Sequence, residues 1–362
     1  MRDAGVDAAR DATVPPPSDA GGPSNPSFII GADITFTQQD VAGGATYVDT
    51  DGTTKPIIQL LKSHGFNYIR MRTFVDPTQP APDPAGGAAF APYSTQGFGD
   101  ITHTVAYGQQ IKAAGMGFLL DFHYSDTWAD PGKQIKPAAW VPDTLAQAVQ
   151  DLHDYTLADI QALVAAGARP DMVQIGNEIT PGMLLTPGTA LGSISTWPQL
   201  AQLLNAGIQA VHEVDPTIKI MLHLDRGGDV TSSRTFINNA LANNVAFDVF
   251  GESCYVAFQG GPATCSTVLQ SLVGSFPNIK FVIAEYNSDT TTQCDNELTQ
   301  ANTVVFALNT LHAGSGLGAF SWEPTRDINA QNLGMFTVNR NVYTPITACI
   351  TQYDAMKVTF GL

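Results

Sequence analysis

Residues 278–285 read NIKFVIAE, a short apolar run that ends in a glutamate. The run is rich in β-branched residues, and it does not alternate polar with apolar side chains. That pattern is typical of a β-strand covered on both faces, as in a parallel sheet flanked by helices. Residues 171–177 (DMVQIGN), followed by Glu178, show the same pattern. The two runs therefore predict an α/β fold in which glutamates stand at the ends of buried strands.

Apolar runs of this kind alternate along the chain with segments of helical periodicity. The predicted strands are residues 28–34, 66–72, 117–122, 171–177, 218–224, 246–251, 279–285 and 317–322. The predicted helices are residues 55–64, 101–114, 143–167, 198–214, 231–244, 266–275, 299–313 and 344–357. In the helix at 143–167 apolar residues recur every three or four positions, and Asp143 is the expected N-cap.

Eight strands, each followed by a helix, predict one catalytic α/β domain at residues 28–362, a (β/α)8 TIM barrel. The structural alternative is a doubly wound parallel sheet, which usually carries a glycine-rich phosphate loop after its first strand. Here the first predicted strand runs into Gly31-Ala32-Asp33, which is not such a loop. The barrel is therefore the favoured fold.

Charge and composition limit the function classes open to this chain. The 362 residues include 33 acidic and 17 basic side chains, a formal net charge of −16. This acidic balance repels phosphate backbones, so we expect no nucleic-acid partner. No apolar run approaches the ~20 residues that cross a bilayer, so we expect no membrane span. Only 14% of residues are charged, against about 25% in an average protein, a composition common among exported proteins.

The N-terminal segment differs from the rest of the chain. Residues 1–27 consist mostly of Pro, Gly, Ser, Ala and Asp, with Val6 and Val14 as the large apolar residues. Such a segment buries too little surface to offset its ordering entropy, so we expect a disordered linker. We expect a secreted or surface-tethered protein whose export signal is not part of this chain. The alternative is a cytoplasmic protein with a polar tail, and in either case we expect a monomer.

Cysteines and histidines give no clear metal site. The spacing excludes CxxC pairs among the four cysteines, Cys254, Cys265, Cys294 and Cys349. They allow up to two disulfides in an oxidising compartment, with three possible pairings, or four buried thiols. His123 and His223 end two predicted strands, but a zinc site there lacks a third ligand. We therefore expect neither a metal nor any other cofactor.

Glutamate is rare in this chain and unevenly placed. Of six glutamates, four fall at or just after the ends of predicted strands, namely Glu178, Glu252, Glu285 and Glu323. In (β/α)8 enzymes the active site lies at this end of the strands. Glycoside hydrolysis requires two carboxyl groups facing each other, one as an acid and the other as a nucleophile or base. A salt bridge explains a single strand-end glutamate more simply, but a pair favours catalysis.

Basic and aromatic residues fall near these glutamates. Arg70 and Arg72 share one face of the second predicted strand. A buried arginine there needs an anion, and pairing with the carboxylate after the seventh strand would favour the ionised form expected of a nucleophile. Trp128, Tyr255 and Trp322 follow the third, sixth and eighth strands, where flat rings can stack on sugars. For Trp322, packing inside the barrel is the alternative.

Longer motifs extend this interpretation beyond single residues. They are GADI (31–34), HGFNYIRMRTFVDP (64–77), LLDFHYSDTWADPGKQIKPAAW (119–140), PDMVQIGNEITPGML (170–184), KIMLHLDRGGD (219–229), FDVFG (247–251) and FSWEP (320–324). With these motifs the chain resembles the endo-β-1,4-galactanases of glycoside hydrolase family 53, which are retaining (β/α)8 glycosidases. The motifs run from the first predicted strand to the eighth.

The resemblance implies roles for individual residues. Glu178 matches the general acid/base and Glu285 the nucleophile, with Arg70 orienting and ionising Glu285. Asn177 matches the residue that hydrogen-bonds the sugar 2-hydroxyl, and Tyr255 matches the tyrosine that hydrogen-bonds the nucleophile. The residues that the resemblance places along the substrate cleft are His123, Trp128, Asp225 and Trp322.

Three segments depart from the family pattern, and one of them is Tyr286-Asn287, where the family usually has a stretch of a small residue and a tyrosine. Residues 251–258 read GESCYVAF where the family usually has Gly-Leu-Ser-Tyr-Tyr-Pro, so this loop gains a carboxylate and loses a proline. Residues 288–295 are short and thinly acidic for the calcium loop that bacterial relatives often carry. We therefore expect no calcium ion, and the altered loop leaves the polymer preference open.

These inferences lead to a secreted endo-acting hydrolase of pectic galactan that cleaves internal β-1,4-galactosyl bonds by double displacement. Retention requires carboxyl groups about 5–5.5 Å apart, whereas ~7 Å or more would indicate inversion. One alternative keeps the chemistry but acts on another polymer, such as mannan or glucan. Another is a carbohydrate-binding barrel without turnover. It is disfavoured because two carboxylates in one cleft raise each other's pKa, an arrangement that binding alone does not need.

Overall fold

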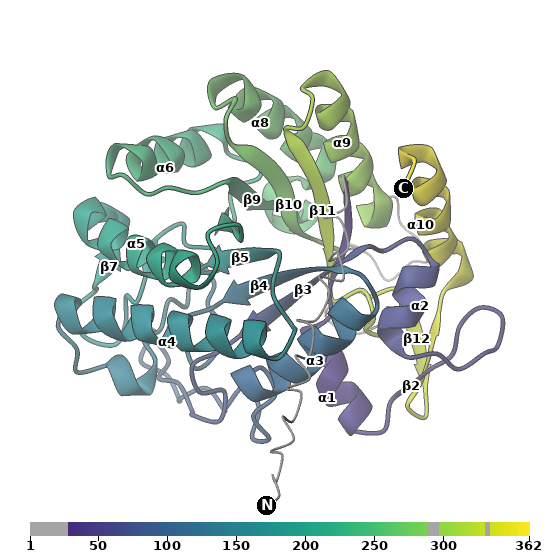
Figure 1. The fold of residues 1–362 in the computed structure, drawn as a ribbon, viewed down its shortest axis with the longest axis horizontal. Helices are drawn as coiled ribbons and strands as arrows, with labels where there is room; N and C mark the ends of the chain where they lie inside the picture. Colours follow the sequence, from purple (N-terminus) through teal and green to yellow (C-terminus); the bar gives the residue numbers. More distant parts are fainter. Residues whose placement is uncertain (1–27, 288–296, 330–333) are drawn as a thin grey trace, which may run out of the picture.

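Eight parallel strands close into a barrel in the computed structural model, which describes residues 28–287, 297–329 and 334–362 (Figure 1). The barrel strands are β1 (Ile29–Asp33), β3 (Tyr68–Thr73), β4 (Gly117–Phe122), β5 (Met172–Ile175), β8 (Lys219–Leu224), β9 (Val249–Ser253), β10 (Lys280–Tyr286) and β11 (Gly316–Trp322). Strands that follow one another in this order pair in parallel, and β1 pairs with β11 to close the ring. Each predicted strand overlaps a barrel strand, so the predicted (β/α)8 fold is confirmed.

Helices surround the barrel (Figure 1). They are α1 (Thr35–Ala42), α2 (Ile57–Ser63), α3 (Ile101–Ala113), α4 (Leu145–Ala165), α5 (Trp197–Val214), α6 (Val230–Ala242), α7 (Val256–Gln259), α8 (Gly261–Ser275), α9 (Glu297–Leu311) and α10 (Thr347–Phe360). Every predicted helical segment overlaps one of these, whereas α1 and α7 have no predicted counterpart. Helix α1 reads TFTQQDVA and lacks an apolar stripe, so periodicity gives no signal for it. The N-cap of α4 is Thr144 rather than Asp143, because Thr144 and Gln147 form a capping box.

Short elements lie outside the barrel in the described residues. One small sheet contains β2 (Thr46–Tyr47), β12 (Phe336–Asn339) and β13 (Val342–Pro345). Another contains β6 (Gly182–Met183) and β7 (Gly192–Ser193). The 3-10 helices are η1 (Ala138–Trp140) and η2 (Ile194–Thr196).

The barrel interior changes from apolar to polar along the strands. Every barrel strand contributes to a buried apolar layer, which consists of Ile29, Tyr68, Leu119, Met172, Met221, Val249, Val282, Ala284 and Phe320. Because side chains alternate along a strand, residues two positions further on also point inward. In four strands these are the fully buried polar residues Arg70, Asp121, Gln174 and His223. The apolar layer therefore supports a polar layer at the carboxyl ends of the strands.

A glycine in β1 makes room for this packing. A Cβ atom at Gly31 would lie 2.2 Å from the ring of Phe320. Only glycine lets the two strands and the ring approach this closely.

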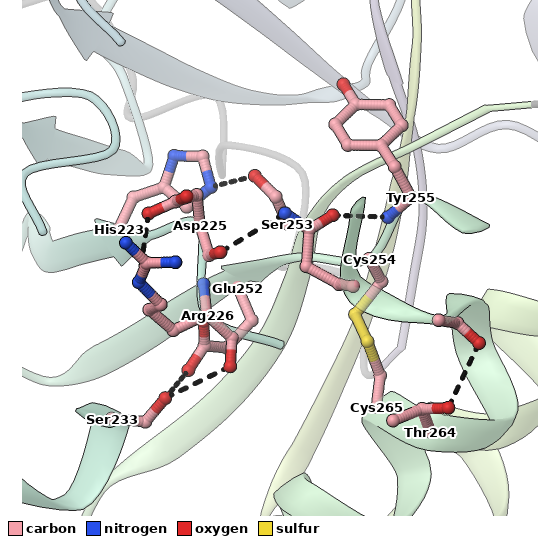
Figure 2. Close-up of a disulfide and its surroundings, with 12 residues drawn as sticks. His223, Asp225, Arg226, Ser233, Glu252, Ser253, Cys254, Tyr255, Thr264 and Cys265 are labelled. Carbon is pink, nitrogen blue, oxygen red and sulfur yellow. Dashed lines mark hydrogen bonds and ion pairs between the residues drawn. A yellow bond between two sulfur atoms is a disulfide. The ribbon is translucent and has the colours of Figure 1, made fainter. Parts of the chain in front are cut away.

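A disulfide joins Cys254, which follows β9 directly, to Cys265 in α8 (Figure 2). It is one of the pairings that the sequence leaves open. Cys349 is buried in α10, and Cys294 lies outside the described residues. The bridge encloses the loop that contains Tyr255 and α7.

Two sequence predictions fall on segments outside the described residues. They concern the linker at 1–27 and the segment at 288–295 that was weighed as a calcium loop. Within the described ranges, no helix is both long and apolar enough to cross a bilayer. The same ranges contain no group of three or more histidine, cysteine, aspartate or glutamate side chains placed to hold a metal ion.

Candidate active site

A cleft with a volume of about 970 Å³ opens at the carboxyl ends of the barrel strands. Eight of the nine predicted site residues line it, namely His123, Trp128, Asn177, Glu178, Asp225, Tyr255, Glu285 and Trp322. The ninth, Arg70, is fully buried and reaches the cleft through its contact with Glu285. The structure therefore brings together residues that seven different barrel strands and their loops contribute.

Glu285 reaches the cleft because β10 is irregular. Ala284 points into the barrel, so strict alternation would turn Glu285 outward. The pairing of β10 with β9 and with β11 shifts register around Ala284, as in a β-bulge. Glu285 thereby joins the cleft, and Tyr286 instead contacts Tyr353 of α10 through their hydroxyl groups, 3.0 Å apart. A bulge thus decides the direction of this carboxylate.

Two hydrogen-bond donors hold the Glu285 carboxylate. Arg70 donates from Nη1 to Oε1 over 2.7 Å, and the Tyr255 hydroxyl donates to Oε2 over 2.8 Å. Burial raises the pKa of Tyr255 well above its usual range, and the charge of Glu285 raises it further. The phenol therefore keeps its proton, and both oxygens of Glu285 act as acceptors.

Arg70 is the centre of a buried ion-pair network. It donates to Asp33 and Asp121 over 2.9 and 2.8 Å, in addition to Glu285. It also donates to Gln174 and Asn177, so that the whole fork of the guanidinium is used. Burial would lower the pKa of Arg70, but the surrounding carboxylates outweigh burial and raise it. The guanidinium is therefore a fixed positive charge below the cleft.

Glu178 lies in a different environment from Glu285. The backbone of Glu178, directly after Gly176-Asn177, has a positive φ of 45°. The side chain of Gln134 supports this turn, since it donates to the carbonyl of Asn177 over 2.9 Å. The only hydrogen bond of the Glu178 carboxyl group among the described residues is to Ser253, with 2.6 Å between Oε1 and Oγ. Burial raises the pKa of Glu178 well above its usual range, and the carboxylate of Glu285 raises it further. Glu178 is therefore suited to carry a proton.

Asn177 lines the same cleft as these two carboxyl groups. Its Oδ1 accepts from Arg70 over 2.9 Å, and its Nδ2 donates to the carbonyl of Ala129 over 2.9 Å. The second hydrogen of Nδ2 has no acceptor among the described residues. An amide held in this way can offer a hydrogen bond to a sugar hydroxyl in the cleft.

Aromatic rings gather around Arg72 at one side of the cleft. The guanidinium carbon lies 4.6 Å from the ring centre of Trp128, 5.2 Å from that of Phe36 and 5.7 Å from that of Trp322. His123 holds the loop after Trp128, since its Nδ1 accepts from the Ala129 amide over 2.9 Å. Trp128 and Trp322 are half-buried and line the cleft, so their exposed faces are available to a sugar.

Two of the four strand-end glutamates do not line the cleft. Glu252 is buried toward α6, where it accepts from the Ser233 hydroxyl and from the backbone amide of Arg226. Glu323 is buried against Arg72, 2.5 Å from Nη2. Arg72 therefore pairs with Glu323 and Asp33, and only Arg70 pairs with the carboxylate of β10. Glu252 faces outward because it has the opposite parity to Ser253 in the same strand.

The chain also matches the model of a known protein family. A family model described as "Glycosyl hydrolase family 53" matches residues 29–343. The chain belongs to glycosyl hydrolase family 53. The match includes all eight barrel strands and every predicted site residue, so the resemblance seen in the sequence motifs is confirmed.

Similarity to individual known proteins extends over most of the chain. A Niallia circulans protein, described as "Uncharacterized protein in bgaB 5'region", is 39% identical over 238 residues, which are 65% of this chain and 60% of that protein. The "Arabinogalactan endo-beta-1,4-galactanase" of Thermothelomyces thermophilus is 29% identical over 336 residues, 87% of this chain and 94% of that protein. The solved "Ignisphaera aggregans GH53 catalytic domain" has a TM-score of 0.76 at 28% identity, covering 92% of this chain and 98% of that one.

Several residues of this family 53 site were not singled out from the sequence. They are the buried polar partners Asp33, Asp121, Gln134, Gln174 and Ser253. Asp121 and Gln174 share the inward parity of Arg70 in neighbouring strands, and this parity was a usable signal. Gln134 lies in a long loop, and nothing in its sequence context indicates its contact with Asn177.

Proposed function

We propose that this protein is a retaining endo-β-1,4-galactanase, with Glu285 as the nucleophile and Glu178 as the general acid/base. The observation that carries the proposal is the contrast between the two carboxyl groups. Glu285 accepts hydrogen bonds from Arg70 and Tyr255, whereas burial and Glu285 raise the pKa of Glu178. Two neighbouring carboxyl groups with such different surroundings are suited to act as an acid and a nucleophile.

The reaction follows from these positions. Glu285 attacks the anomeric carbon while Glu178 gives its proton to the leaving oxygen, which forms a glycosyl-enzyme. Glu178 then removes a proton from water, and the resulting attack on the anomeric carbon releases the product and regenerates Glu285. Arg70 and Tyr255 keep the Glu285 carboxylate in one orientation, and Asn177 offers its Nδ2 hydrogen to the 2-hydroxyl of the reacting sugar.

Substrate class is the part of the proposal that relies on relatives. The Thermothelomyces thermophilus relative bears a galactanase name. The cleft supports an extended substrate, because Trp128, Trp322 and Phe258 are among the residues that line it. Phe258 is 81% exposed and lies in the loop that departs from the family pattern. A different β-1,4-linked polymer, such as mannan or glucan, is the alternative that this loop makes worth testing.

Release of reducing ends from debranched β-1,4-galactan, β-mannan and cellulose tests the proposal. We expect release from galactan and the appearance of short galactooligosaccharides. Glu285→Ala should lower turnover by at least about a thousandfold. Glu213→Gln, which changes an exposed glutamate of α5, should leave it unchanged. Activity on mannan or cellulose alone would overturn galactan as the proposed substrate. No release of reducing ends from any polymer would favour a carbohydrate-binding protein without turnover.

Stereochemistry tests the mechanism separately. Proton NMR during the first minutes of hydrolysis should show the β-anomer of the new reducing end before mutarotation mixes the anomers. An initial α-anomer would indicate inversion and would exclude Glu285 as a covalent nucleophile.

We also propose that the protein acts outside the cytoplasm as a monomeric catalytic domain at residues 28–362. The disulfide between Cys254 and Cys265 supports an oxidising compartment. Light scattering of the purified protein checks the oligomeric state, with a mass near 38.4 kDa expected for the monomer. Fractionation of cells that produce the protein from its complete gene checks the compartment.

A further inference from the structure

Hydrogen bonds connect the side chains of Glu178, Ser253, His223 and Asn177 in a row. Glu178 contacts Ser253, with 2.6 Å between Oε1 and Oγ. Ser253 Oγ in turn lies 3.0 Å from Nε2 of His223 (Figure 2). On the other side of the imidazole ring, Nδ1 lies 2.8 Å from Oδ1 of Asn177. Each contact is a hydrogen bond, so the position of each hydrogen can be worked out from the fixed end of the chain.

The orientation of Asn177 is that fixed end. Arg70 can only donate, so the Asn177 atom that lies 2.9 Å from Nη2 must be the oxygen. The carbonyl of Ala129 can only accept, so the atom that lies 2.9 Å from it must be the nitrogen. Both neighbours give the same orientation, with Oδ1 toward His223.

His223 must then carry a hydrogen on Nδ1. Two acceptors cannot share a contact of 2.8 Å, and Oδ1 of Asn177 has no hydrogen to give. Nε2 of Gln174 also lies 3.3 Å from Nδ1, but its two hydrogens have shorter bonds, of 3.0 Å each, to the carbonyl of Gly176 and to Oδ1 of Asn177. His223 is fully buried, and burial lowers its pKa well below the usual range, with the charge of Arg70 lowering it further. The ring is therefore neutral with a single hydrogen, and Nε2 is left as an acceptor.

Ser253 completes the assignment. Its hydroxyl has one hydrogen, and Nε2 of His223 needs that hydrogen to make a bond over 3.0 Å. The hydrogen between Ser253 and Glu178 must therefore come from the carboxyl group. We propose that Ser253 and His223 act as positioning residues that hold Glu178 in its protonated form in the resting enzyme. The assignment of hydrogens is independent of the proposed function, whereas its value for catalysis rests on Glu178 being the general acid.

Delivery of the proton needs only a movement of the Glu178 carboxyl group. A half-turn of this group carries its proton from Ser253 to the cleft, and no covalent bond is broken in this movement. The Ser253 hydroxyl stays turned toward Nε2 of His223, so its hydrogen is not available to the carboxylate of Glu178.

Other charged groups nearby also affect the protonation of Glu178 and of His223. Around Glu178 these are the carboxylates of Glu285 in β10, Asp225 after β8 and Asp130 after β4, and all three favour the protonated form. Around His223 the charges of Arg70 and His123 oppose a second proton, whereas that of Asp121 favours one. Since these groups stay in place when Ser253 is changed, a variant of Ser253 isolates the effect of its hydroxyl.

Carboxyl NMR of the intact protein tests the proposal without any need for activity. The chain has six glutamates, so labelling with δ-13C glutamate gives few resonances, and Glu178→Gln identifies that of Glu178. We expect Ser253→Ala to lower the pKa of Glu178 by about one unit, because the protonated form loses its acceptor. His223→Ala should also lower it, since Ser253 is then free to donate to the carboxylate. Ser233→Ala is the matched control, because Ser233 donates to Glu252 outside the cleft and should leave Glu178 unchanged.

The direction of the shift decides between the two arrangements. If Ser253 donates to Glu178 in the resting enzyme, Ser253→Ala removes a bond to the carboxylate and the pKa of Glu178 rises, which overturns the proposal. An unchanged pKa also overturns it. Nitrogen-15 spectra of labelled histidine give a second test without substitution, since His223 is expected as the Nδ1–H tautomer and a hydrogen on Nε2 contradicts it. If the wild-type protein fails to hydrolyse galactan, these spectra still report on the chain, so the two failures are distinguishable.

Discussion

Nη1 of Arg70 lies 2.7 Å from Oε1 of Glu285, and the arginine side chain is completely buried. This guanidinium faces the carboxylates of Asp33 and Asp121 as well. Its removal would leave these buried charges without a counter-charge. The pair is therefore part of the stability of the barrel as well as part of the cleft.

We expect Arg70→Leu to lower the free energy of unfolding by about 3–5 kcal/mol, since it breaks a buried ion pair from one side. Arg169→Leu is the control, because Arg169 is one-third exposed where it pairs with Asp215, and its loss should cost less than about 1 kcal/mol. Urea denaturation of both variants measures the difference. Equal losses would show that the buried network contributes little to stability.

Tyr255→Phe removes one hydrogen bond to Glu285 and keeps the ring. A bond to a charged group contributes about 1.5–3 kcal/mol, so kcat/KM on galactan should fall about 10- to 100-fold. The melting temperature should change little. Tyr343→Phe, at a partly exposed site of β13, should have no effect on kcat/KM. A Tyr255→Phe enzyme with wild-type kcat/KM would exclude a role for this hydroxyl.

Glu252 should make the stability of the protein depend on pH. Burial raises the pKa of Glu252 from 4.5 to about 8. Between these values the folded state holds a proton that the unfolded state has released, so stability should fall as the pH rises through this range and level off above it. Glu252→Gln cannot ionise, and its free energy of unfolding should fall less between pH ~5 and ~8. Parallel curves of the free energy of unfolding against pH for Glu252→Gln and wild type would contradict the raised pKa. Asp51→Asn, at an exposed site, is the control and should give the same curve as wild type.

The disulfide between Cys254 and Cys265 should matter for activity as well as stability. It encloses Tyr255 and Gln259, and Gln259 accepts from the Tyr255 amide and donates to the carbonyl of Asp225. Cys254→Ser/Cys265→Ser should lose about 2–3 kcal/mol of stability, because the unfolded chain gains freedom. At a temperature where the variant is fully folded, kcat/KM should still be reduced. Wild-type kcat/KM in the folded variant would limit the bridge to a structural role.

Phe258 should contribute to the binding of the polymer. Its ring is 81% exposed at the edge of the cleft, and stacking on a sugar should lower KM about 2- to 10-fold relative to Phe258→Ala. Val358 is equally exposed, on α10 and outside the residues that line the cleft, so Val358→Ala is the matched control. Isothermal titration calorimetry of galactan binding, in the inactive Glu285→Ala background, gives the affinities with and without each substitution directly. The same affinity with and without Phe258 would exclude a sugar-binding role.

The sequence was sufficient for the barrel and for the residues around its cleft. Strand positions were predictable because both faces of a parallel strand are apolar, and that signal is local. The grouping of Glu178, Glu285, Asn177 and Arg70 followed because active sites of this fold lie at one end of the strands. These inferences need only the order of the elements and the end of each strand.

What the sequence did not provide depends on exact register and on contacts between distant segments. Alternation alone would have turned Glu285 away from the cleft, and the bulge that redirects it has no clear mark in the residues of β10. The position of Glu252 at a strand end predicts a place at the mouth of the barrel, whereas the alternation of side chains along β9 turns it toward α6. The pairing of Cys254 with Cys265 and the contact of Gln134 with Asn177 are set by loop paths, which local patterns do not encode.

Close packing beneath the disulfide limits how this cleft can be re-engineered. A Cβ atom at Gly227 would lie 2.6 Å from the sulfur of Cys265 and 2.8 Å from that of Cys254, and one at Gly228 would lie 2.5 Å from the carbonyl oxygen of Gln259. The loop after β8 and the loop after β9 therefore fit only as a matched pair. Anyone who grafts residues 254–265 from a homologue to alter polymer choice must transplant residues 225–229 with them, or keep both glycines.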